Sequence, residues 1–498
     1  MENIKRKAGI LLHITSLPSK YGIGTLGKEA YSFVDWLSEA NLKVWQVLPL
    51  VPTNYGDSPY QSVSSSAYNY YLIDLDILKK KGLLNNTDLE NVEFYTDEKK
   101  VDYKLLFENR IDILYKAFMN YNIGADFIQY FASKKAHDFA IFMTLKKMHN
   151  YKPWYNWADK YKNYSSLLVQ EIMKNNLIDY LFWTWTQFEF IDEWNNLHNY
   201  AKSKGIEIMG DMPLYVAYDS VEVWKNPEMF ILNEDKSPIL VAGCPPDAFS
   251  DDGQLWGNPV YDWDYLKQNG YSWWNQRIKN AFLLYDIVRI DHFRGFDRFY
   301  TIKFGAPNAK EGQWMDGPKF DFFKDKTKLN IVAEDLGVID DGVRLLMHQT
   351  KYPGMKVLEF AFNGDKNNEH KPSNFTKNYV VYTGTHDNMP LYQYINDLDE
   401  IALKTLIDDL KTECKLVNIN FDTHNIKSIC KAIIELAFAC KANVCIIPMQ
   451  DLLFEGKSSR MNLPSTLSPD NWSYRILKRN LSKSLQLRLK NYVETYKR

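Results

Sequence analysis

The sequence predicts an α/β fold, a (β/α)8 TIM barrel with large subdomains inserted between barrel strands, and three observations support this. Short apolar or β-branched runs bounded by turn residues recur along the chain, as buried strands do. Helix-like segments lie between these runs. Acidic residues stand at or just past the ends of the runs, and the carboxyl ends of barrel strands form the active-site face of this fold.

Eight segments have the composition of buried strands. Most lack polar alternation, as expected of parallel strands covered on both faces. In chain order they are residues 8–14, 43–50, 206–210, 285–290, 330–334, 356–362, 378–384 and 443–449. Helices are predicted between them, for example over residues 28–41, 178–205, 272–284 and 340–350.

The spacing of these strands is uneven and predicts insertions, because a plain βα unit needs only about 30 residues. Residues 78–175, within the second-to-third strand gap, are rich in Lys, Asp, Glu and Asn and show helical patterns. We interpret them as an inserted helical subdomain. Residues 211–271 are predicted to be an inserted region of substrate loops. No internal repeat or low-complexity linker is seen, so residues 1–498 are predicted to form a single elaborated catalytic domain.

Composition limits the kinds of partner. The net charge of −2 lacks the basic excess of nucleic-acid-binding proteins, and no segment has the roughly 20 apolar residues of a membrane span. The cysteines are odd in number without a CxxC pair, and the N-terminal apolar stretch is too short for a signal peptide. We therefore expect a cytoplasmic protein without nucleic-acid or membrane partners. The 15% aromatic content fits either large cores or surfaces on which sugar rings stack.

Five acids follow predicted strands, and parallel strand ends would bring them to one cleft. Each alone could be a surface acid or the N-cap of the next helix, but recurrence at five strands weakens that interpretation. These acids are Asp211, Asp291, Glu334, Asp387 and Asp451.

Residues 289–296, RIDHFRGF, are the most informative run. Side chains alternate along a strand, so Arg289 and Asp291 share a face. The guanidinium would lower the pKa of Asp291 and suit it as a nucleophile, unless the two form only a structural ion pair. Glu334 ends an apolar strand, where a raised pKa would suit a general acid. Two such carboxyl groups about 5–5.5 Å apart would give a retaining double displacement.

Further segments suggest contacts with sugar hydroxyls or rings. His386 and Asp387 adjoin another strand end, and no His spacing elsewhere favours zinc, so a pair that binds hydroxyl groups fits better. Residues 55–61 and the long loop 245–259 contain Gly, Pro and aromatic residues. Loops of this length in compact domains are often functional, although plain packing would also explain both.

Residues 22–27 match the GxGxxG pattern of dinucleotide-binding folds. The preceding strand ends near residue 14, however, so a long loop stands where that turn should be tight. The second strand also ends without the acid that would hold a ribose. A nicotinamide-dependent oxidoreductase is therefore disfavoured.

The motifs RIDHFRGF, AEDLG and YTGTHDN, in this order, closely resemble the 4-α-glucanotransferases called amylomaltases or disproportionating enzymes, glycoside hydrolase family 77. Residues 45–50, 210–216, 245–263 and 450–466 also resemble family segments. The resemblance extends from residue 13 to residue 475, nearly the whole chain.

This resemblance implies an enzyme that cleaves an α-1,4-glucan bond, holds a glucanyl ester and transfers it to the 4-hydroxyl of another glucan or of glucose. It implies Asp291 as nucleophile, Glu334 as acid/base and Asp387 as a transition-state-stabilising acid. It implies no metal or organic cofactor, and a place in starch, glycogen or maltodextrin metabolism. The implied substrate-binding residues are Tyr60, Asp211, Gln254, Trp256, Arg289, His386 and Asn462.

Two departures from the family pattern lie near the implied acceptor side. Met389-Pro390 follows the HDN motif where acidic and Thr residues are usual, and Ser373 replaces a usual His. They leave the three carboxylates in place but leave open the acceptor preference and product size. The alternatives to transfer are an α-1,4-glucan hydrolase on the same fold and a catalytically silent glucan-binding protein.

Overall fold

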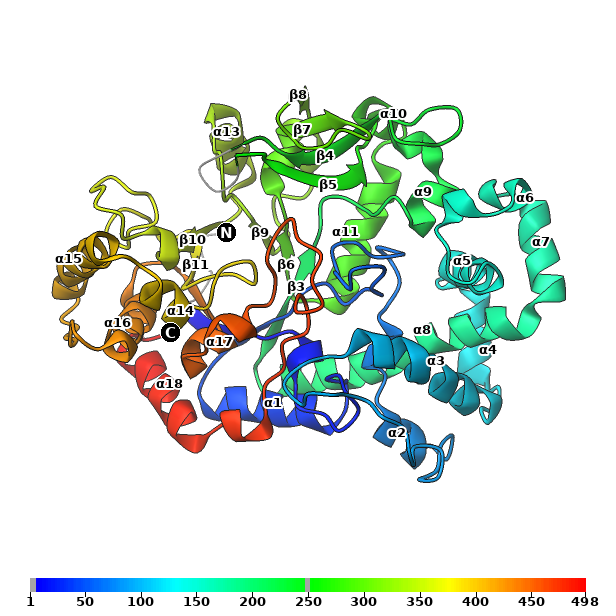
Figure 1. Cartoon of the computed structure of the whole chain (residues 1–498), viewed down its shortest axis with the longest axis horizontal. Helices are drawn as coiled ribbons and strands as arrows, with labels where there is room; N and C mark the ends of the chain where they lie inside the picture. The colour runs from blue at the N-terminus through cyan, green and yellow to red at the C-terminus, as the bar shows by residue number, and fades with distance from the viewer. Residues whose placement is uncertain (1–5, 247–250) are drawn as a thin grey trace.

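A closed barrel of parallel strands lies at the centre of the computed structural model, which describes residues 6–246 and 251–498 (Figure 1). Its strand order is β10-β11-β12-β1-β2-β3-β6-β9. The backbone N–H of Ala333 in β9 donates to the carbonyl of Pro353, just before β10, over 2.9 Å, so the two edge strands meet. The strands are β1 (Lys7–Leu11), β2 (Val44–Gln46), β3 (Glu207–Met212), β6 (Ile287–Ile290), β9 (Ile331–Ala333), β10 (Gly354–Val357), β11 (Tyr379–Tyr382) and β12 (Val444–Pro448).

The barrel prediction is confirmed, since each of the eight predicted segments contains or overlaps one barrel strand. The predicted strand 356–362 begins and ends later in the chain than the observed one. Strand β10 ends at Val357, and Leu358–Phe360 form a 3-10 turn. Leu358 and Phe362 are nevertheless buried, and this burial of a turn explains why the sequence looks like a longer strand.

Helices surround the barrel at the positions expected between strands. In α1 the buried residues Ala30, Phe33, Val34 and Leu37 recur at helical spacing and face the core. The strands themselves are buried on both faces; every residue of β12 is buried, for example. The helices that lie between or after barrel strands in the chain include α1 (Lys28–Glu39), α8 (Leu177–Ser203), α11 (Ser272–Leu284), α12 (Lys319–Phe323), α13 (Asp341–Thr350), α14 (Leu391–Asn396), α15 (Glu400–Leu416), α16 (Ile426–Ala439), α17 (Met449–Leu453) and α18 (Lys483–Thr495).

The residues between β2 and α8 form helices that lie to one side of the barrel in Figure 1. The buried Lys146 of this group forms an ion pair with Asp219, which follows β3. Asp219 also accepts hydrogen bonds from the Trp154 backbone, 3.1 Å, and from Asn54, 3.0 Å, so it joins the helices to the loop after β2. That residues 78–175 form a separate inserted subdomain stays a prediction. These helices are α2 (Leu75–Lys80), α3 (Tyr103–Met119), α4 (Ala125–Ala132), α5 (His137–Met148), α6 (Asp159–Lys162) and α7 (Ser166–Asn175).

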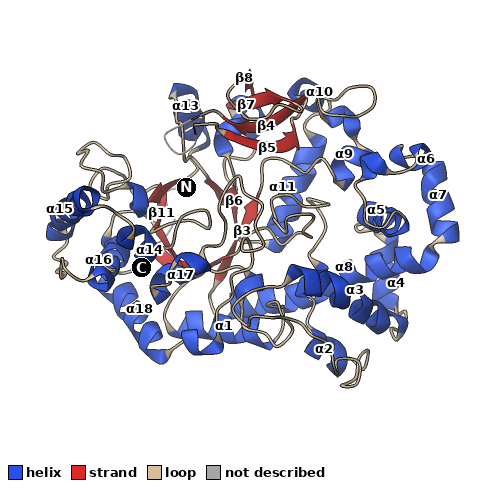
Figure 2. Ribbon diagram, in the orientation of Figure 1, coloured by secondary structure: helices blue, strands red, loops and turns tan. Residues whose placement is uncertain are grey.

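A second, antiparallel sheet was not predicted. It has the order β5-β4-β7-β8 and lies apart from the barrel strands in Figure 2. Its small core contains Val241, Tyr300, Ile302 and Ala309. Short α9 (Val221–Lys225) and α10 (Trp263–Gln268) flank β4 and β5 in the sequence. The strands are β4 (Leu240–Cys244), β5 (Gln254–Pro259), β7 (Arg298–Lys303) and β8 (Gly312–Asp316). Part of the predicted loop 245–259, residues 247–250, lies outside the described residues.

The GxGxxG run of residues 22–27 has no Rossmann geometry. A 3-10 turn, Ile14–Ser16, and a further loop separate β1 from α1. A Cβ on Gly27, the N-cap of α1, would lie 2.0 Å from the Asp74 carboxylate. An acidic side chain therefore occupies the place where a phosphate would bind a helix N-terminus. None of the described helices is long and apolar enough to cross a membrane.

Candidate active site

The acids predicted from strand ends lie at the carboxyl ends of the barrel strands. Asp211 belongs to β3, and Asp291, Glu334 and Asp387 follow β6, β9 and β11. Strands β3 and β6 pair so that Asp211 stands beside Arg289, and β6 pairs with β9 so that Ile290 stands beside Ala333. The registers of three adjacent strands therefore bring these groups to one edge of the barrel.

Arg289 links two of the acids. Its guanidinium donates to Asp211 over 2.5 Å and to Asp291 over 2.9 Å. Burial by itself would lower the pKa of Arg289, but the Asp211 and Asp291 carboxylates outweigh it and raise that pKa well above the usual range. The Asp211 side chain is 0% exposed, whereas that of Asp291 is 27% exposed. Asp291 is thus the acid of this pair that a ligand can reach.

Glu334 is held against the backbone that follows Asp291. Its carboxylate accepts the N–H of His292 over 2.8 Å and the N–H of Leu336 over 2.7 Å. Its own backbone carbonyl accepts the N–H of Phe293 over 3.1 Å. His292 adopts a left-handed conformation, φ 50°, which turns the chain sharply after Asp291. Glu334 and Asp291 therefore lie next to one another at the ends of adjacent strands.

Burial raises the pKa of both carboxyl groups. Burial raises the pKa of Asp291 to about 6, while Arg289 opposes this shift. Burial, with a contribution from the Asp291 charge, raises the pKa of Glu334 to about 7, while Arg289 and the two backbone N–H groups oppose it. The predicted lowering of the Asp291 pKa by Arg289 is present, but burial outweighs it, so the net shift is upward. The predicted raised pKa of Glu334 is confirmed.

Asp387 is held by residues from the C-terminal segment. The Asn462 side chain donates to its carboxylate over 2.7 Å, and Arg460 donates to its backbone carbonyl over 2.5 Å. The Asn462 backbone N–H also donates to the carbonyl of His386 over 3.1 Å, and the His386 imidazole lies 3.5 Å from the Asp387 carboxylate. Asn462 and His386, both named from the sequence, thus contact Asp387 directly.

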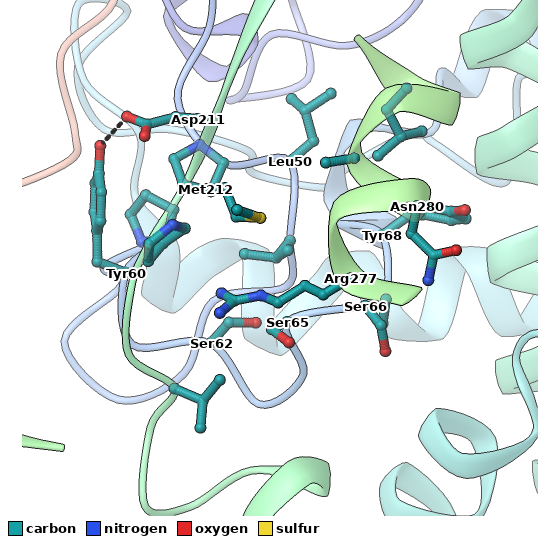
Figure 3. A pocket seen from close by; sticks show the side chains of 18 of the residues that line it. Leu50, Tyr60, Ser62, Ser65, Ser66, Tyr68, Asp211, Met212, Arg277 and Asn280 are labelled. Carbon is teal, nitrogen blue, oxygen red and sulfur yellow. Dashed lines mark hydrogen bonds between the residues drawn. The ribbon is translucent and has the colours of Figure 1, made fainter. Parts of the chain in front are cut away.

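Tyr60 connects the two halves of the site. Its hydroxyl donates to Asp211 over 2.7 Å (Figure 3). Its ring stacks on His386, with centroids 5.2 Å apart and planes 10° apart, and lies 5.5 Å from the ring of Trp472. The Asp211–Arg289 pair and the His386–Asp387 pair are therefore joined through one aromatic side chain.

Gln254 and Trp256 lie on β5 of the antiparallel sheet, which the sequence had suggested only as a loop. The Trp256 indole donates to the Gln254 side chain over 3.1 Å. The Trp256 ring packs against the His292 ring in a T-shaped arrangement, with the two centroids 4.8 Å apart. The antiparallel sheet therefore places an aromatic ring against His292, the residue that directly follows Asp291.

Asp451 does not join this group of acids, contrary to the prediction of five convergent carboxylates. It is only 3% exposed, and both its oxygens accept hydrogen bonds from the loop that carries Asp387. The sequence also missed Arg460 and Trp472. Both lie in the C-terminal region that resembled the family, but only their spatial proximity to Asp387 and Tyr60 marks them as part of the site.

A separate pocket lies behind Tyr60, between the loop after β2, strand β3 and helix α11 (Figure 3). Its lining includes Tyr60 and Asp211 but not Asp291, Glu334 or Asp387. The buried Arg277, which also lines this pocket, donates to the Leu214 carbonyl over 3.1 Å. The pocket therefore shares Tyr60 and Asp211 with the carboxylate site but is not lined by the other three acids.

Comparison with known proteins decides the family. A family model described as 4-alpha-glucanotransferase matches residues 12–480. The chain belongs to the 4-alpha-glucanotransferase family, glycoside hydrolase family 77. It is an enzyme of that class, and the resemblance of its motifs to this family is confirmed.

Similarity to individual 4-alpha-glucanotransferases extends over nearly the full length. The enzyme of Clostridium butyricum is 42% identical, with 93% of this chain and 95% of the relative covered. That of Streptococcus pneumoniae serotype 4 is 39% identical over 99% and 98%. The structure of a Streptococcus agalactiae amylomaltase in complex with acarbose matches with a TM-score of 0.93 and 38% identity, covering 99% of this chain and 100% of that one.

Proposed function

We propose that this 4-alpha-glucanotransferase works by a retaining double displacement, with Asp291 as nucleophile and Glu334 as acid/base. The observation that carries the proposal is the pair of neighbouring carboxyl groups at the ends of the adjacent strands β6 and β9, Asp291 held by Arg289 and Glu334 held by two backbone N–H groups. Burial raises the pKa of Glu334 to about 7, which suits a proton donor, while the ion pair with Arg289 favours the ionised form of Asp291, which suits a nucleophile. Arg289 holds one Asp291 oxygen in place for attack.

In the first half-reaction an Asp291 oxygen attacks C1 of the donor glucan, and the bond between C1 and the leaving O4 breaks. The Glu334 proton passes to that oxygen, so the leaving glucan departs with a hydroxyl group. In the second half-reaction Glu334 takes the proton of an acceptor 4-hydroxyl, whose oxygen attacks C1 and releases Asp291. We expect the two carboxyl groups to lie about 5–5.5 Å apart, as this mechanism requires.

Asp387 is proposed to stabilise the transition state by accepting hydrogen bonds from donor-sugar hydroxyls. Asn462 and His386 hold it at the same barrel end as Asp291. Tyr60, Asp211, Gln254, Trp256 and Arg289 are proposed to complete the sugar contacts. Asp211 accepts hydrogen bonds from Tyr60 and Arg289, and its side chain is 0% exposed, so its proposed contribution to sugar binding is to orient these two residues.

The proposed partners are α-1,4-glucan oligosaccharides and glucose. An acarbose complex exists for the similar Streptococcus agalactiae enzyme, and acarbose is accordingly expected to compete with the donor in this chain. The proposed metabolic setting is the use of starch, glycogen or maltodextrin.

Incubation with maltotriose tests this function. Transfer gives glucose together with maltopentaose and longer oligomers, whereas glucose and maltose alone would show a hydrolase. Asp291→Asn tests the nucleophile, because the first half-reaction cannot proceed without the carboxylate. Retention of activity in that variant, with the site otherwise intact, would rule out the assigned role.

A further inference from the structure

The loop 383–391, between β11 and α14, carries His386 and Asp387 and is anchored at both ends by one buried carboxylate. The Thr383 hydroxyl donates to Oδ2 of Asp451 over 2.5 Å. The backbone N–H of Leu391 donates to Oδ1 of Asp451 over 2.7 Å. Asp451 itself lies in α17, directly after β12, and is 3% exposed.

Asp451 has a fixed position of its own. It belongs to a short helix in which Met449, Gln450 and Leu452 are also buried. Its carbonyl accepts the N–H of Phe454 over 3.2 Å. Both carboxylate oxygens are used by the loop, and burial leaves them away from the surface that a glucan could reach. Its contacts therefore suit a residue that positions the loop, not one that touches the substrate.

The middle of the same loop is held from another strand end. The side chain of Asn388 donates to Glu359 over 3.0 Å and accepts the backbone N–H of Thr385 over 2.9 Å. The Thr385 hydroxyl in turn accepts the N–H of Asp387 over 3.2 Å. The contacts of Asn388 fix the turn within the loop, whereas Asp451 fixes the positions of the two ends of the loop.

We propose that Asp451 is a positioning residue for the glucan-transfer reaction, which holds Asp387 and His386 at the catalytic position by tying together Thr383 and Leu391. The inference rests on the role of Asp387 proposed above. A shift of about 1 Å in a catalytic group can lower a rate by about 10²-fold. Loss of the Asp451 carboxylate would release both ends of the loop and so allow such a shift.

The test is Asp451→Ala, measured by steady-state transfer with maltotriose and by thermal unfolding. We expect kcat to fall about 10²-fold with KM changed less than about 3-fold, since the loss concerns placement of a group that acts in the transition state. Asp451→Asn should recover most of kcat. Its amide oxygen can still accept the Leu391 N–H, and its NH2 group can donate to the Thr383 hydroxyl oxygen.

Thr383→Val provides a second variant if Asp451→Ala does not fold. It removes the hydroxyl group that donates to Asp451, with little change in the shape of the side chain. We expect kcat to fall about 10-fold, and the double variant Thr383→Val/Asp451→Ala to equal Asp451→Ala, since contacting residues are not additive. The matched control is Asp286→Ala. Asp286 also ties two segments, accepting from His198 and the Ile208 N–H over 2.9 Å each, but at the opposite ends of the barrel strands.

Asp286→Ala should lower the melting temperature with less than about 2-fold change in kcat, because that barrel face serves stability. The proposal is overturned if Asp451→Ala or Thr383→Val keeps wild-type kcat in folded protein, or if Asp286→Ala lowers kcat equally at a matched loss of melting temperature. The variant Asp387→Asn distinguishes a failure of the proposed role of Asp387 from a failure of the inference about Asp451. If it is fully active, the proposed role of Asp387 fails; if it is inactive while folded Asp451→Ala is fully active, only the present inference fails.

Discussion

Replacing Glu334 by Gln separates its catalytic role from its structural one. The Glu334 carboxylate accepts two backbone N–H groups, from His292 over 2.8 Å and from Leu336 over 2.7 Å. A Gln side chain has one acceptor oxygen, so one N–H would face an NH2 group. An unsatisfied buried donor costs about 1–3 kcal/mol, partly offset because the neutral amide avoids burial of a charge.

The catalytic loss is expected to be larger than the structural one. A positioned general acid contributes about 10²–10⁴-fold, which is about 3–5.5 kcal/mol of barrier at about 1.4 kcal/mol per tenfold. The assay compares transfer from maltotriose with transfer from an α-glucosyl fluoride, whose leaving group needs no proton. Glu334→Gln should lose most activity with maltotriose and much less in the fluoride half-reaction that forms the ester. Equal loss with both donors would refute the assignment of Glu334 as proton donor.

The same variant tests the raised pKa of Glu334 through stability. Its folded-state pKa, about 7, lies above the ordinary value of 4.5, so the folded state binds the proton more tightly than the unfolded state. The resulting stabilisation is fully present below pH 4.5 and is lost as the pH rises to about 7. The free energy of unfolding of wild type relative to Glu334→Gln should therefore decrease across this window, as measured by urea unfolding. A constant difference would contradict the raised pKa.

Three further outcomes are expected. The kcat/KM for maltotriose should follow a bell in pH with limbs near 6 and 7, because activity needs ionised Asp291 and protonated Glu334; a profile flat from pH 5 to 8 would contradict this. Tyr60→Phe removes the donor to Asp211 and should lower the free energy of unfolding by about 1–3 kcal/mol, measured by urea unfolding; unchanged stability would show that this bond contributes nothing. Asn462→Ala removes a bond to Asp387 and should lower kcat about 10-fold at unchanged melting temperature, whereas Leu463→Ala next to it should not; equal effects would place the cause in the loop backbone.

The barrel could be predicted from sequence because its strands are short, apolar on both faces and separated by helices. The antiparallel sheet could not. Strand β8, Gly312–Asp316, has no fully buried residue, and β5 contains both Gly and Pro. Such strands carry no alternating or continuous apolar pattern, and their pairing with β4 and β7 becomes visible only in three dimensions.

The positions of Asp291, Glu334 and Asp387 after barrel strands were determined by sequence alone, because strand ends in this fold share one face. Tertiary structure decided what surrounds them. Burial depends on the whole fold, and it outweighs the lowering of the Asp291 pKa by Arg289. Hydrogen bonds between segments far apart in the chain gave Asp451 its place beneath the loop of Asp387. A sequence shows which residues end a strand, but contacts between distant segments decide whether an acid faces the cleft or holds another residue in it.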